Sequence, residues 1–253
     1  MMGPFEDRTA LVTGAGRGIG RAVAVELARA GARTVLMARS QDELAESARL
    51  VRAAGGEALV VQGDLSRPDR ISDLLGGARD DLGDVDVLVN NAGVVWPLGP
   101  SAAVDAAEWA AAIDVNLVSA ATLTFALLPG MLSRKWGRIV NVSSGVAERP
   151  TSMIGANAYA TAKAALEAHT VNLAAEVAGS GVTVNAFRPG RVDTAMQTWI
   201  RERDPEEIGA ALHEQFTDYH RAGLISPEES ARSLVSRLPG DATGQTWKAS
   251  DPV

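Results

Sequence analysis

Tyr159 and Lys163 interrupt an alanine-rich stretch, residues 157–163 (NAYATAK), and stand four residues apart. In a helix this spacing places the two side chains on one face, one turn from each other. A phenol has an ordinary pKa of about 10, but a neighbouring ammonium favours the phenolate and lowers that pKa. The pair therefore predicts a tuned acid–base that protonates a carbonyl oxygen or deprotonates an alcohol. The alternative is a structural tyrosine beside a solvated lysine.

A second chemical signal is the glycine-rich stretch that follows the first apolar segment, residues 13–20 (TGAGRGIG). Glycine has no side chain, so the backbone can approach a ligand closely. The helix expected next presents free N–H groups and the positive end of its dipole to the same place. The stretch therefore predicts a site for an anion such as a pyrophosphate. The alternative is a tight strand-to-helix turn without a ligand.

The elements that must position these groups alternate along almost the whole chain. Strands are predicted at residues 9–13, 34–38, 58–62, 85–90, 138–143, 182–187 and 245–248, and helices at 21–30, 41–54, 105–134 and 156–178, with a further one from Ser226. Continuous apolar strands separated by helices are typical of a parallel sheet covered on both faces. No Gly/Pro/Ser-rich linker or internal repeat divides the chain, so we expect one α/β domain over residues 1–253.

Six segments in register resemble motifs of the short-chain dehydrogenase/reductase family, classical type. They are TGxxxGxG through Gly14, Gly18 and Gly20, Asp64-Leu65, NNAG at 90–93, Asn116, Ser143-Ser144 with Tyr159-x-x-x-Lys163, and RPGRVDT at 188–194. The resemblance runs from about residue 9 to 245. It implies a Rossmann-like doubly wound parallel sheet of strand order 3-2-1-4-5-6-7 with helices on both faces. It also implies an oxidoreductase that uses a nicotinamide cofactor.

The resemblance assigns roles to residues by position. The catalytic set that it implies is Asn116, Ser144, Tyr159 and Lys163. The cofactor-binding set is Gly14, Arg17, Gly18, Ile19, Gly20, Arg39, Asp64, Leu65, Asn91, Ala92, Gly93, Tyr159, Lys163, Pro189, Gly190, Val192 and Thr194. Asn116 is implied to hold a water that relays protons to Lys163. A buried amide that repairs a helix kink is the alternative, and both can hold.

The serine of the catalytic set is the point at which the chain departs from the family pattern. Val146 occupies the family's usual position for it, so we expect the loop over residues 145–158 to be two residues longer and the pocket wall to differ. A hydroxyl there would hold the substrate oxygen as a neutral donor. We predict Ser144 for this role, with Ser143 as the alternative.

The end of the second predicted strand bears on the choice of cofactor. A carboxylate there reads a ribose 2′-hydroxyl, whereas arginine suits a 2′-phosphate. The chain has Ala38-Arg39-Ser40 at this point and Arg17 in the glycine loop. Two arginines that converge on one phosphate make charge-assisted hydrogen bonds. The sequence therefore predicts NADPH over NADH, and the alternative for Arg39 is a solvated residue at a helix start.

The walls of the substrate pocket are expected at residues 94–98, 148–155 and in the segment after Asp193. They supply Trp96, Met153, Ile154, Met196 and Trp199. Such walls suit a cyclic, aromatic or acyl ketone rather than a sugar polyol, although core packing uses the same residue types. The charged, weakly periodic segment 193–223 is predicted to be a lid over the site. A surface helical hairpin is the alternative.

Composition narrows the remaining function classes. The formal charge is −7 and the pI near 5.1, which argues against broad binding to nucleic acid or anionic lipid. The chain has no cysteine, and its histidines, 169, 213 and 220, lack metal-ligand spacing, so no metal is predicted. The apolar stretch 117–132 contains Ser, Thr and Pro129, which favours a buried or interface helix over a membrane span. The N-terminus does not resemble a signal peptide, so a cytoplasmic location is expected.

The leading functional prediction is an NADPH-dependent reductase of a ketone, acting on a small-molecule carbonyl or alcohol. A non-catalytic sensor of NADP(H), or a lyase or epimerase on the same fold, is the alternative. The resemblance implies a homo-oligomer, a dimer or tetramer, built on the long helix and the helix that holds Tyr159. The C-terminal TGQTWKASDPV lacks the Gly-Gly tail often seen in the family, which weakens the case for a second interface.

Overall fold

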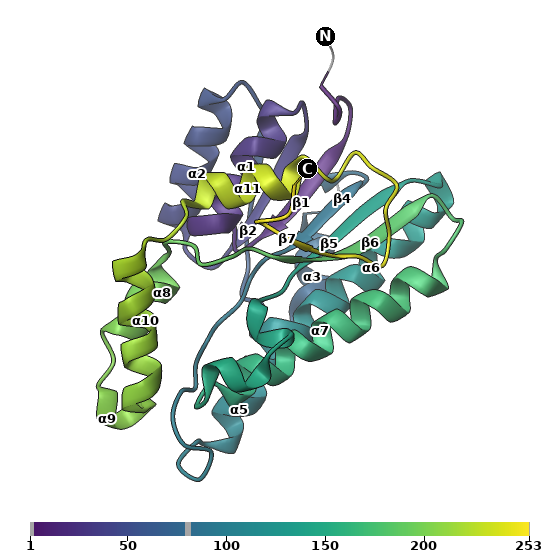
Figure 1. Ribbon diagram of the computed structural model, residues 1–253. Coiled ribbons are helices and arrows are strands. Elements are labelled where there is room, and N and C mark those ends of the chain that lie inside the picture. Colours follow the sequence, from purple (N-terminus) through teal and green to yellow (C-terminus); the bar gives the residue numbers. More distant parts are fainter. Residues whose placement is uncertain (1–2, 79–81, 253) are drawn as a thin grey trace.

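A parallel sheet of seven strands forms the centre of the molecule in the computed structural model, which describes residues 3–78 and 82–252 (Figure 1). The strands are β1 (Thr9–Thr13), β2 (Arg33–Ala38), β3 (Ala58–Gln62), β4 (Val87–Asn90), β5 (Gly137–Val142), β6 (Val182–Arg188) and β7 (Thr246–Lys248). Their spatial order is β3-β2-β1-β4-β5-β6-β7, which confirms the expected topology. The order reverses between β1 and β4, and the crevice above such a switch point is where doubly wound sheets bind ligands.

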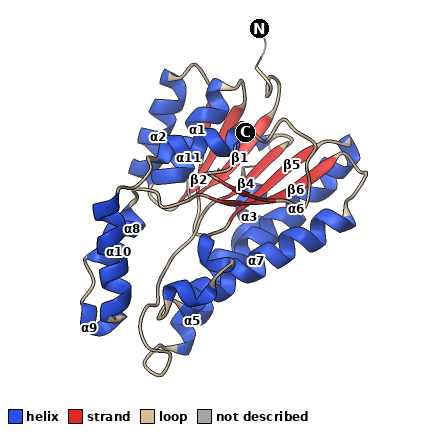
Figure 2. Ribbon diagram, in the orientation of Figure 1, coloured by secondary structure: helices blue, strands red, loops and turns tan. Residues whose placement is uncertain are grey.

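Helices cover both faces of the sheet (Figure 2). One layer is formed by α1 (Gly18–Arg29), α2 (Gln41–Ala53) and α11 (Pro227–Val235), and the other by α3 (Ile71–Gly77), α5 (Ala106–Ile113), α6 (Ser119–Arg134) and α7 (Asn157–Glu176). Strand β1 serves both layers, because Ala10 and Val12 pack in one core and Leu11 in the other. Such two-sided burial explains why the strands are continuously apolar.

The long helix predicted at 105–134 is present, in three pieces. A π-helical turn, Asp114–Val118, joins α5 to α6. Pro129 lies inside α6, within the long helix that the sequence predicts. Pro129 and Phe125, four residues earlier, are both on the exposed side. Proline has no N–H, so the carbonyl of Phe125 lacks its helical hydrogen-bond donor. Because this side of the helix is exposed, that carbonyl faces outward and the proline is tolerated.

By length and composition alone, the helix Ala106–Arg134 could cross a membrane, with a mean hydropathy of 1.7 over its most apolar window. Its packing is that of a core helix on one side, where Leu123, Leu128 and Met131 are buried under the sheet. On the other side Phe125 is 59% exposed. Length and composition alone are weak evidence for a membrane span, and an exposed apolar face of this kind marks an interaction surface.

The segment 193–223 folds into three helices, α8 (Ala195–Arg201), α9 (Pro205–Ile208) and α10 (Ala210–Ala222). In Figure 1 they project beyond the sheet, on the side that carries α5 and the start of α7. They form a third apolar core around Ile200, Ile208, Leu212 and Phe216, and this core includes Tyr159. The segment is therefore packed on the candidate site and is not an isolated surface hairpin.

Candidate active site

The glycine loop between β1 and α1 has the backbone that its sequence predicts. Gly14 and Gly18 have φ of 62° and 56°, which side chains disfavour. A Cβ at Gly20 would collide with the carbonyl oxygen of Gly14, so the loop can close only with glycine there. Arg17 is the N-cap of α1 and turns its guanidinium toward Glu43 rather than toward the first turn of the helix. The N–H groups of that turn therefore face the crevice.

The loop is braced from two sides. From β4, Nδ2 of Asn91 donates to the carbonyl of Thr13 at 2.9 Å, and the main-chain N–H groups of Asn91 and Ala92 donate to Oγ1 of Thr13 at 3.0 Å each. From α2, Oγ of Ser47 donates to the carbonyl of Ala15 at 2.8 Å. Arg21 donates to the carbonyl of Gly16. Sequence reasoning missed Ser47 and Arg21; the available signal was that Ser47 falls on the apolar face of its helix, between Leu44 and Val51.

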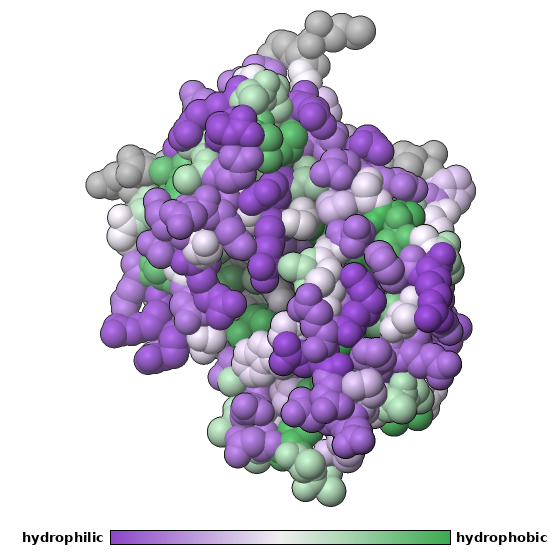
Figure 3. All heavy atoms as spheres, turned by 90° about the vertical axis from the view of Figure 1, so that its left-hand side faces the viewer, coloured by the Kyte–Doolittle hydropathy of each residue, from purple (hydrophilic) through white to green (hydrophobic). Residues whose placement is uncertain are grey.

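The crevice has room for a phosphate group between the loop and the segment after β6. A cavity of about 410 Å³ is lined by Arg17, Gly18, Arg21, Asp193, Thr194, Ala195, Thr198, Pro227 and Glu228. A Cβ at Gly18 would meet only the side chain of Thr194, at 3.5 Å. Figure 3 shows the face that carries α2 and the segment 193–223, which is mostly hydrophilic and hollowed near its middle. These residues fit a dinucleotide pyrophosphate. A larger hollow, about 520 Å³, lies between β3 and α3, away from the tyrosine.

The end of the crevice beside β2 contains Arg17 and Arg39, which the sequence predicted there. It also contains the carboxylate of Glu43, which the sequence did not predict. Arg39 is exposed at the end of β2, beside Ala38. Nη1 of Arg17 lies 3.3 Å from Oε1 of Glu43, the residue that follows Asp42 in the first turn of α2. Asp64 is exposed and accepts a hydrogen bond from the N–H of Ser66 at 2.9 Å, while Leu65 is buried. A Cβ on Gly16, next to Arg17, would lie 2.9 Å from Oε2 of Glu43 and 3.5 Å from Cβ of Ala38, next to Arg39, so these segments meet at one end of the crevice.

The segment after β6, which the resemblance predicts to flank the nicotinamide, borders the crevice on the side of Thr194. Gly190 has a φ of 82°, and the carbonyl of Pro189 accepts a hydrogen bond from Ser230 of α11 at 3.0 Å. Val192 is buried and pairs with Ile225 in an isolated bridge. Thr194 is the N-cap of α8 and lies over Gly18. Ile19 packs against the core beneath the loop.

Tyr159 and Lys163 lie near the start of α7, and both are almost fully buried, at 8% and 3% exposure. Nζ of Lys163 lies 5.7 Å from the centre of the Tyr159 ring and donates to the carbonyl of Val142 at 2.8 Å. Burial lowers the pKa of Lys163 to about 8. A lysine with this pKa can release and take up protons near neutrality.

The expectation that the ammonium lowers the pKa of the phenol is not met in this chain. Burial raises the pKa of Tyr159, and a side-chain hydrogen bond with Ser144 offsets the rise only in part. The reason is that desolvation disfavours the charged form of each buried side chain, so burial raises the pKa of the phenol while it lowers that of the lysine. The protein alone therefore holds Tyr159 as a neutral phenol, the form that donates a proton.

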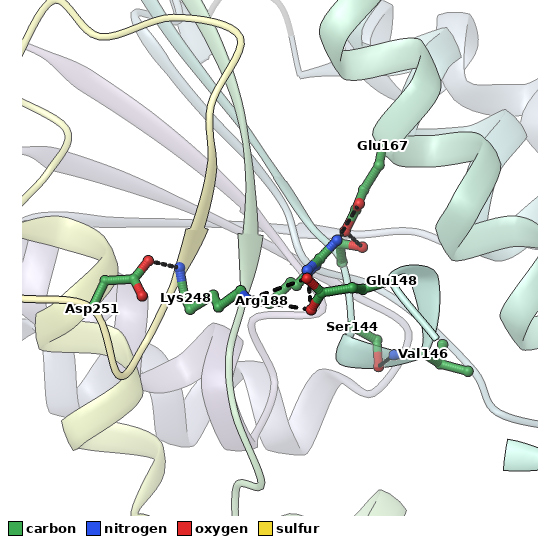
Figure 4. A network of polar contacts seen from close by, with 8 residues as sticks. Ser144, Val146, Glu148, Glu167, Arg188, Lys248 and Asp251 are labelled. Carbon is green, nitrogen blue, oxygen red and sulfur yellow. Dashed lines mark hydrogen bonds and ion pairs between the residues drawn. The ribbon is translucent and has the colours of Figure 1, made fainter. Parts of the chain in front are cut away.

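The two candidate serines face different partners. Oγ of Ser144 accepts a hydrogen bond from the N–H of Val146 at 3.4 Å, and its hydroxyl also interacts with the Tyr159 side chain, which offsets part of the rise that burial causes in the pKa of that phenol. Ser143 is buried and donates to Oε1 of Glu167 at 2.6 Å. In Figure 4 Ser144 lies apart from the ion pairs of Glu167. The geometry thus places Ser144, and not Ser143, beside the phenol.

Asn116 is 1% exposed and lies within the π-helical turn. Its Nδ2 donates to the carbonyls of Val94 and Ala112 at 2.8 Å each, and its Oδ1 accepts from the N–H of Val94 at 3.1 Å. The side chain thus supplies a hydrogen bond to the carbonyl of Ala112, where the π-helical turn interrupts the regular main-chain hydrogen bonds of the helix. A Cβ at Gly93 would lie 2.8 Å from Oδ1 of Asn116 and 3.5 Å from Nζ of Lys163, so both side chains approach Gly93.

The predicted pocket walls are only partly assembled around the phenol. Met153, Met196 and Trp199 pack against the core that contains Tyr159. Ile154 is 79% exposed, and Trp96 is half-buried and outside that core. Val95, Val146, Ile200, Leu212 and Phe216 complete the apolar surroundings. The periodicity of the sequence could not predict that these five residues meet, because they come from four separate segments of the chain.

Comparison with known proteins identifies a family that agrees with the geometry of the site. The short chain dehydrogenase family model matches residues 8–205. The chain is 34% identical over 249 residues to the 3-oxoacyl-(acyl-carrier-protein) reductase FabG of Pseudomonas aeruginosa, covering 98% of this chain and 96% of that protein. It is 35% identical to the acetoacetyl-CoA reductase of Cupriavidus necator, covering 94% and 93%.

Solved structures show the same similarity. A candidate NAD(P)-dependent gluconate 5-dehydrogenase from Beutenbergia cavernae, with NADP bound at low occupancy, superimposes with a TM-score of 0.84 at 34% identity. The match covers 98% of this chain and 97% of that one. Levodione reductase superimposes with a TM-score of 0.85 at 27% identity, over 96% of each chain.

Proposed function

The chain belongs to the short-chain dehydrogenase/reductase family and is an oxidoreductase of that family; from this premise we propose that it reduces a ketone with NADPH. The single observation that carries the proposal is the arrangement of Tyr159, which is buried, hydrogen-bonded to Ser144 and held one turn before Lys163. A neutral phenol at the end of a nucleotide crevice suits the protonation of a developing alkoxide.

Each residue of the proposed catalytic set has a part that its contacts support. Ser144 holds the substrate oxygen, because its hydroxyl already faces the phenol. Tyr159 donates the proton to that oxygen as the alkoxide forms. Lys163, with its pKa near 8, returns a proton to the phenol. The reduced nicotinamide, when bound, supplies the hydride that goes to the carbonyl carbon.

Asn116 is proposed to support this proton supply through its main chain. Both N–H donors of its amide and one lone pair of Oδ1 are used by Val94 and Ala112. Its main-chain carbonyl lies in the π turn, where the regular helix ladder is interrupted. A water on that carbonyl, near Lys163, would carry protons from outside. The side-chain amide of Asn116 would then repair the helix at the π turn, and its main-chain carbonyl would hold the water that relays protons.

The preference for NADPH is proposed from the adenosine end of the crevice. Arg17 and Arg39 supply two guanidinium groups, and Ala38 supplies no carboxylate that would bind a ribose 2′-hydroxyl. The Beutenbergia cavernae protein, which is similar over nearly its whole length, holds NADP. Steady-state kinetics with both cofactors tests the preference; equal or better efficiency with NADH would refute it.

The substrate is proposed to be a ketone with a cyclic, aromatic or acyl body. The core around Tyr159 contains aliphatic side chains and also Met153, Met196, Trp199 and Phe216. Two polar side chains, Gln215 and Tyr219, are hydrogen-bonded to each other nearby. The relatives include reductases of 3-oxoacyl and acetoacetyl thioesters and of levodione, which are ketones of this kind. Helices α8 to α10 are proposed to act as its lid.

A homo-oligomer is proposed from the exposed apolar face of α6 and α7. Phe125, Leu132 and Val171 on these helices, and Val118 at the end of the π-helical turn before α6, are 37–59% exposed. The ring of Phe125 contacts His169 of α7 edge-on, which makes the two helices one continuous surface. A second copy would cover this face by two-fold symmetry. A cytoplasmic location stays a prediction.

The experiment that tests the function follows the absorbance of NADPH with the purified protein and a panel of ketones. We expect turnover with cyclic or acyl ketones and none with Tyr159→Phe. NADPH binding without turnover of any ketone would support the sensor instead, and turnover by Tyr159→Phe at the wild-type rate would contradict the proposed acid.

A further inference from the structure

Arg188 ends β6, directly before Pro189, and its guanidinium is enclosed, with 11% of the side chain exposed. Every nitrogen of the group has a carboxylate partner. Nε and Nη2 donate to the two oxygens of Glu167 at 2.8 Å each, and Nη1 lies 2.7 Å from Oε2 of Glu148 (Figure 4). The hydrogen bonds to Glu167 raise the pKa of Arg188. Such paired, charge-assisted bonds fix a guanidinium in one orientation.

Glu167 connects this guanidinium to the catalytic segments. It lies on α7 one turn after Lys163, and its Oε1 also accepts the hydroxyl of Ser143 at 2.6 Å. Ser143 precedes Ser144 in the chain. The ends of β5 and β6 and the catalytic helix therefore meet at one carboxylate.

Glu148 connects the same guanidinium to the wall of the pocket. It follows the short helical turn Gly145–Ala147, in the segment after Ser144 that continues to Met153. Its carboxylate also accepts from Nζ of Lys248 of β7, at 3.2 Å. The hydrogen bond from Lys248, and next the charge of Arg188, lower the pKa of Glu148. One exposed carboxylate thus joins the wall segment to the ends of two strands.

We propose that Glu148 is a positioning residue, which tethers the segment 145–156 to Arg188 and Lys248 and so keeps the pocket wall in place for the ketone. The inference rests on the proposed function, because it assumes that the ketone binds against this wall. The sequence predicts that this segment is longer than in the family pattern, and a longer loop has more conformations to lose when it is ordered. With the tether gone, ketone binding must order the segment, whereas the chemical step and the nucleotide crevice are unchanged.

The kinetic test uses Glu148→Gln, which keeps the shape of the side chain and removes its charge. We expect KM for the ketone to rise about three- to fivefold, the range for a partly exposed ion pair, with kcat and the Kd of NADPH unchanged. Lys248→Met should give a smaller rise, because Arg188 still holds the carboxylate. Glu46→Gln, which breaks an exposed ion pair with Arg49 on α2, is the matched control and should change nothing.

Ionic strength separates a charge tether from a packing role. Raising it from about 0.05 M to about 0.5 M screens exposed charges. KM of the wild type should rise toward that of Glu148→Gln, while KM of the variant stays constant. Equal KM values for the variant and the wild type at low salt would overturn the proposal. So would a fall in kcat matched by weaker NADPH binding, which a general structural defect would cause.

A measurement without ketone keeps the proposal testable even if the protein reduces no ketone. Hydrogen exchange of peptides that cover residues 145–156, in the presence of NADPH, should be faster in Glu148→Gln than in the wild type and in Glu46→Gln. Unchanged exchange in these peptides would refute the tether. If NADPH binds, exchange rises and no ketone turns over, the proposed function fails while the tether stands.

Discussion

Lys163 of α7 donates a hydrogen bond of 2.8 Å to the main-chain carbonyl of Val142, the last residue of β5. The catalytic helix is thereby fixed to the strand that leads into Ser143 and Ser144. The contact brings an ammonium into a site where 3% of the lysine is exposed, and burial lowers its pKa from 10.5 to about 8.

The lowered pKa of Lys163 predicts a dependence of stability on pH. Between about pH 8 and 10.5 the unfolded chain binds the proton and the folded chain does not, so stability rises with pH in this window. Lys163→Met lacks this titration. The unfolding free energy of the wild type minus that of the variant should therefore rise from pH 8 to 10.5, by up to about 3 kcal/mol. Denaturant titrations across this range measure it, and a flat or falling difference would contradict the assignment.

The different partners of the two adjacent serines predict different losses. Ser144→Ala removes the hydroxyl beside Tyr159, and kcat should fall about 10²- to 10³-fold, as for a lost oxyanion donor. Ser143→Ala removes a bond to Glu167 at some distance from the phenol and should cost at most about tenfold. NADPH binding, measured by fluorescence, should stay within about twofold in both. Comparable losses in kcat would show that Ser143 also contacts the substrate oxygen.

Tyr159→Phe tests the acid itself. The variant loses the proton donor and keeps the ring, so kcat should fall at least about 10³-fold with folding and NADPH binding retained. The raised pKa of Tyr159 also keeps the phenol protonated at neutral pH. Ketone reduction should therefore not fall between pH 6 and 7.5, which a stopped-flow pH profile measures. A loss of rate over this interval would indicate that the phenol ionises there.

The exposed ring of Phe125 predicts the oligomeric state of a variant. Phe125→Asp places a charge in the apolar face of α6, where the ring is 59% exposed. If a second copy covers this face, the variant should sediment as a monomer, and the wild type as a dimer or tetramer. Thr151→Asp, which changes an exposed position outside these helices, is the control. Unchanged sedimentation of Phe125→Asp would place the interface elsewhere.

The strands and the identity of the paired chemical residues could be predicted from local signals in the sequence, whereas the strand order was predicted from the family resemblance. Apolar runs mark the strands, and four-residue spacing places Tyr159 and Lys163 on one face. The strand bounds were off by one or two residues, as at β4, which begins at Val87 rather than at residue 85. The long helix predicted at 105–134 continues through Pro129, but the π-helical turn Asp114–Val118 within it was not predicted.

The direction of the pKa of Tyr159 and the network of Arg188 could not be predicted in the same way. Each depends on burial and on contacts between segments far apart in the chain, such as Glu148 with Lys248, one hundred residues later. Sequence spacing predicts that a lysine lies near a tyrosine, but it does not predict how deeply the two side chains are buried. Glu43 was missed for the same reason, since its partner Arg17 lies across the glycine loop.

Glu43 leads to a prediction about cofactor selectivity. Its carboxylate pairs with Arg17 at 3.3 Å, and a Cβ on Gly16 would lie 2.9 Å from its Oε2, so it stands beside the loop where a 2′-phosphate would meet Arg17. A carboxylate and a phosphate that share one arginine repel each other. Glu43→Gln should therefore tighten NADPH binding about two- to fivefold and leave NADH binding unchanged, with a smaller gain at high salt because the pair is exposed. Calorimetric titration of both cofactors measures this, with Glu46→Gln, one turn further along α2, as the control. Weaker NADPH binding by Glu43→Gln would instead mean that the carboxylate orients Arg17 for the phosphate.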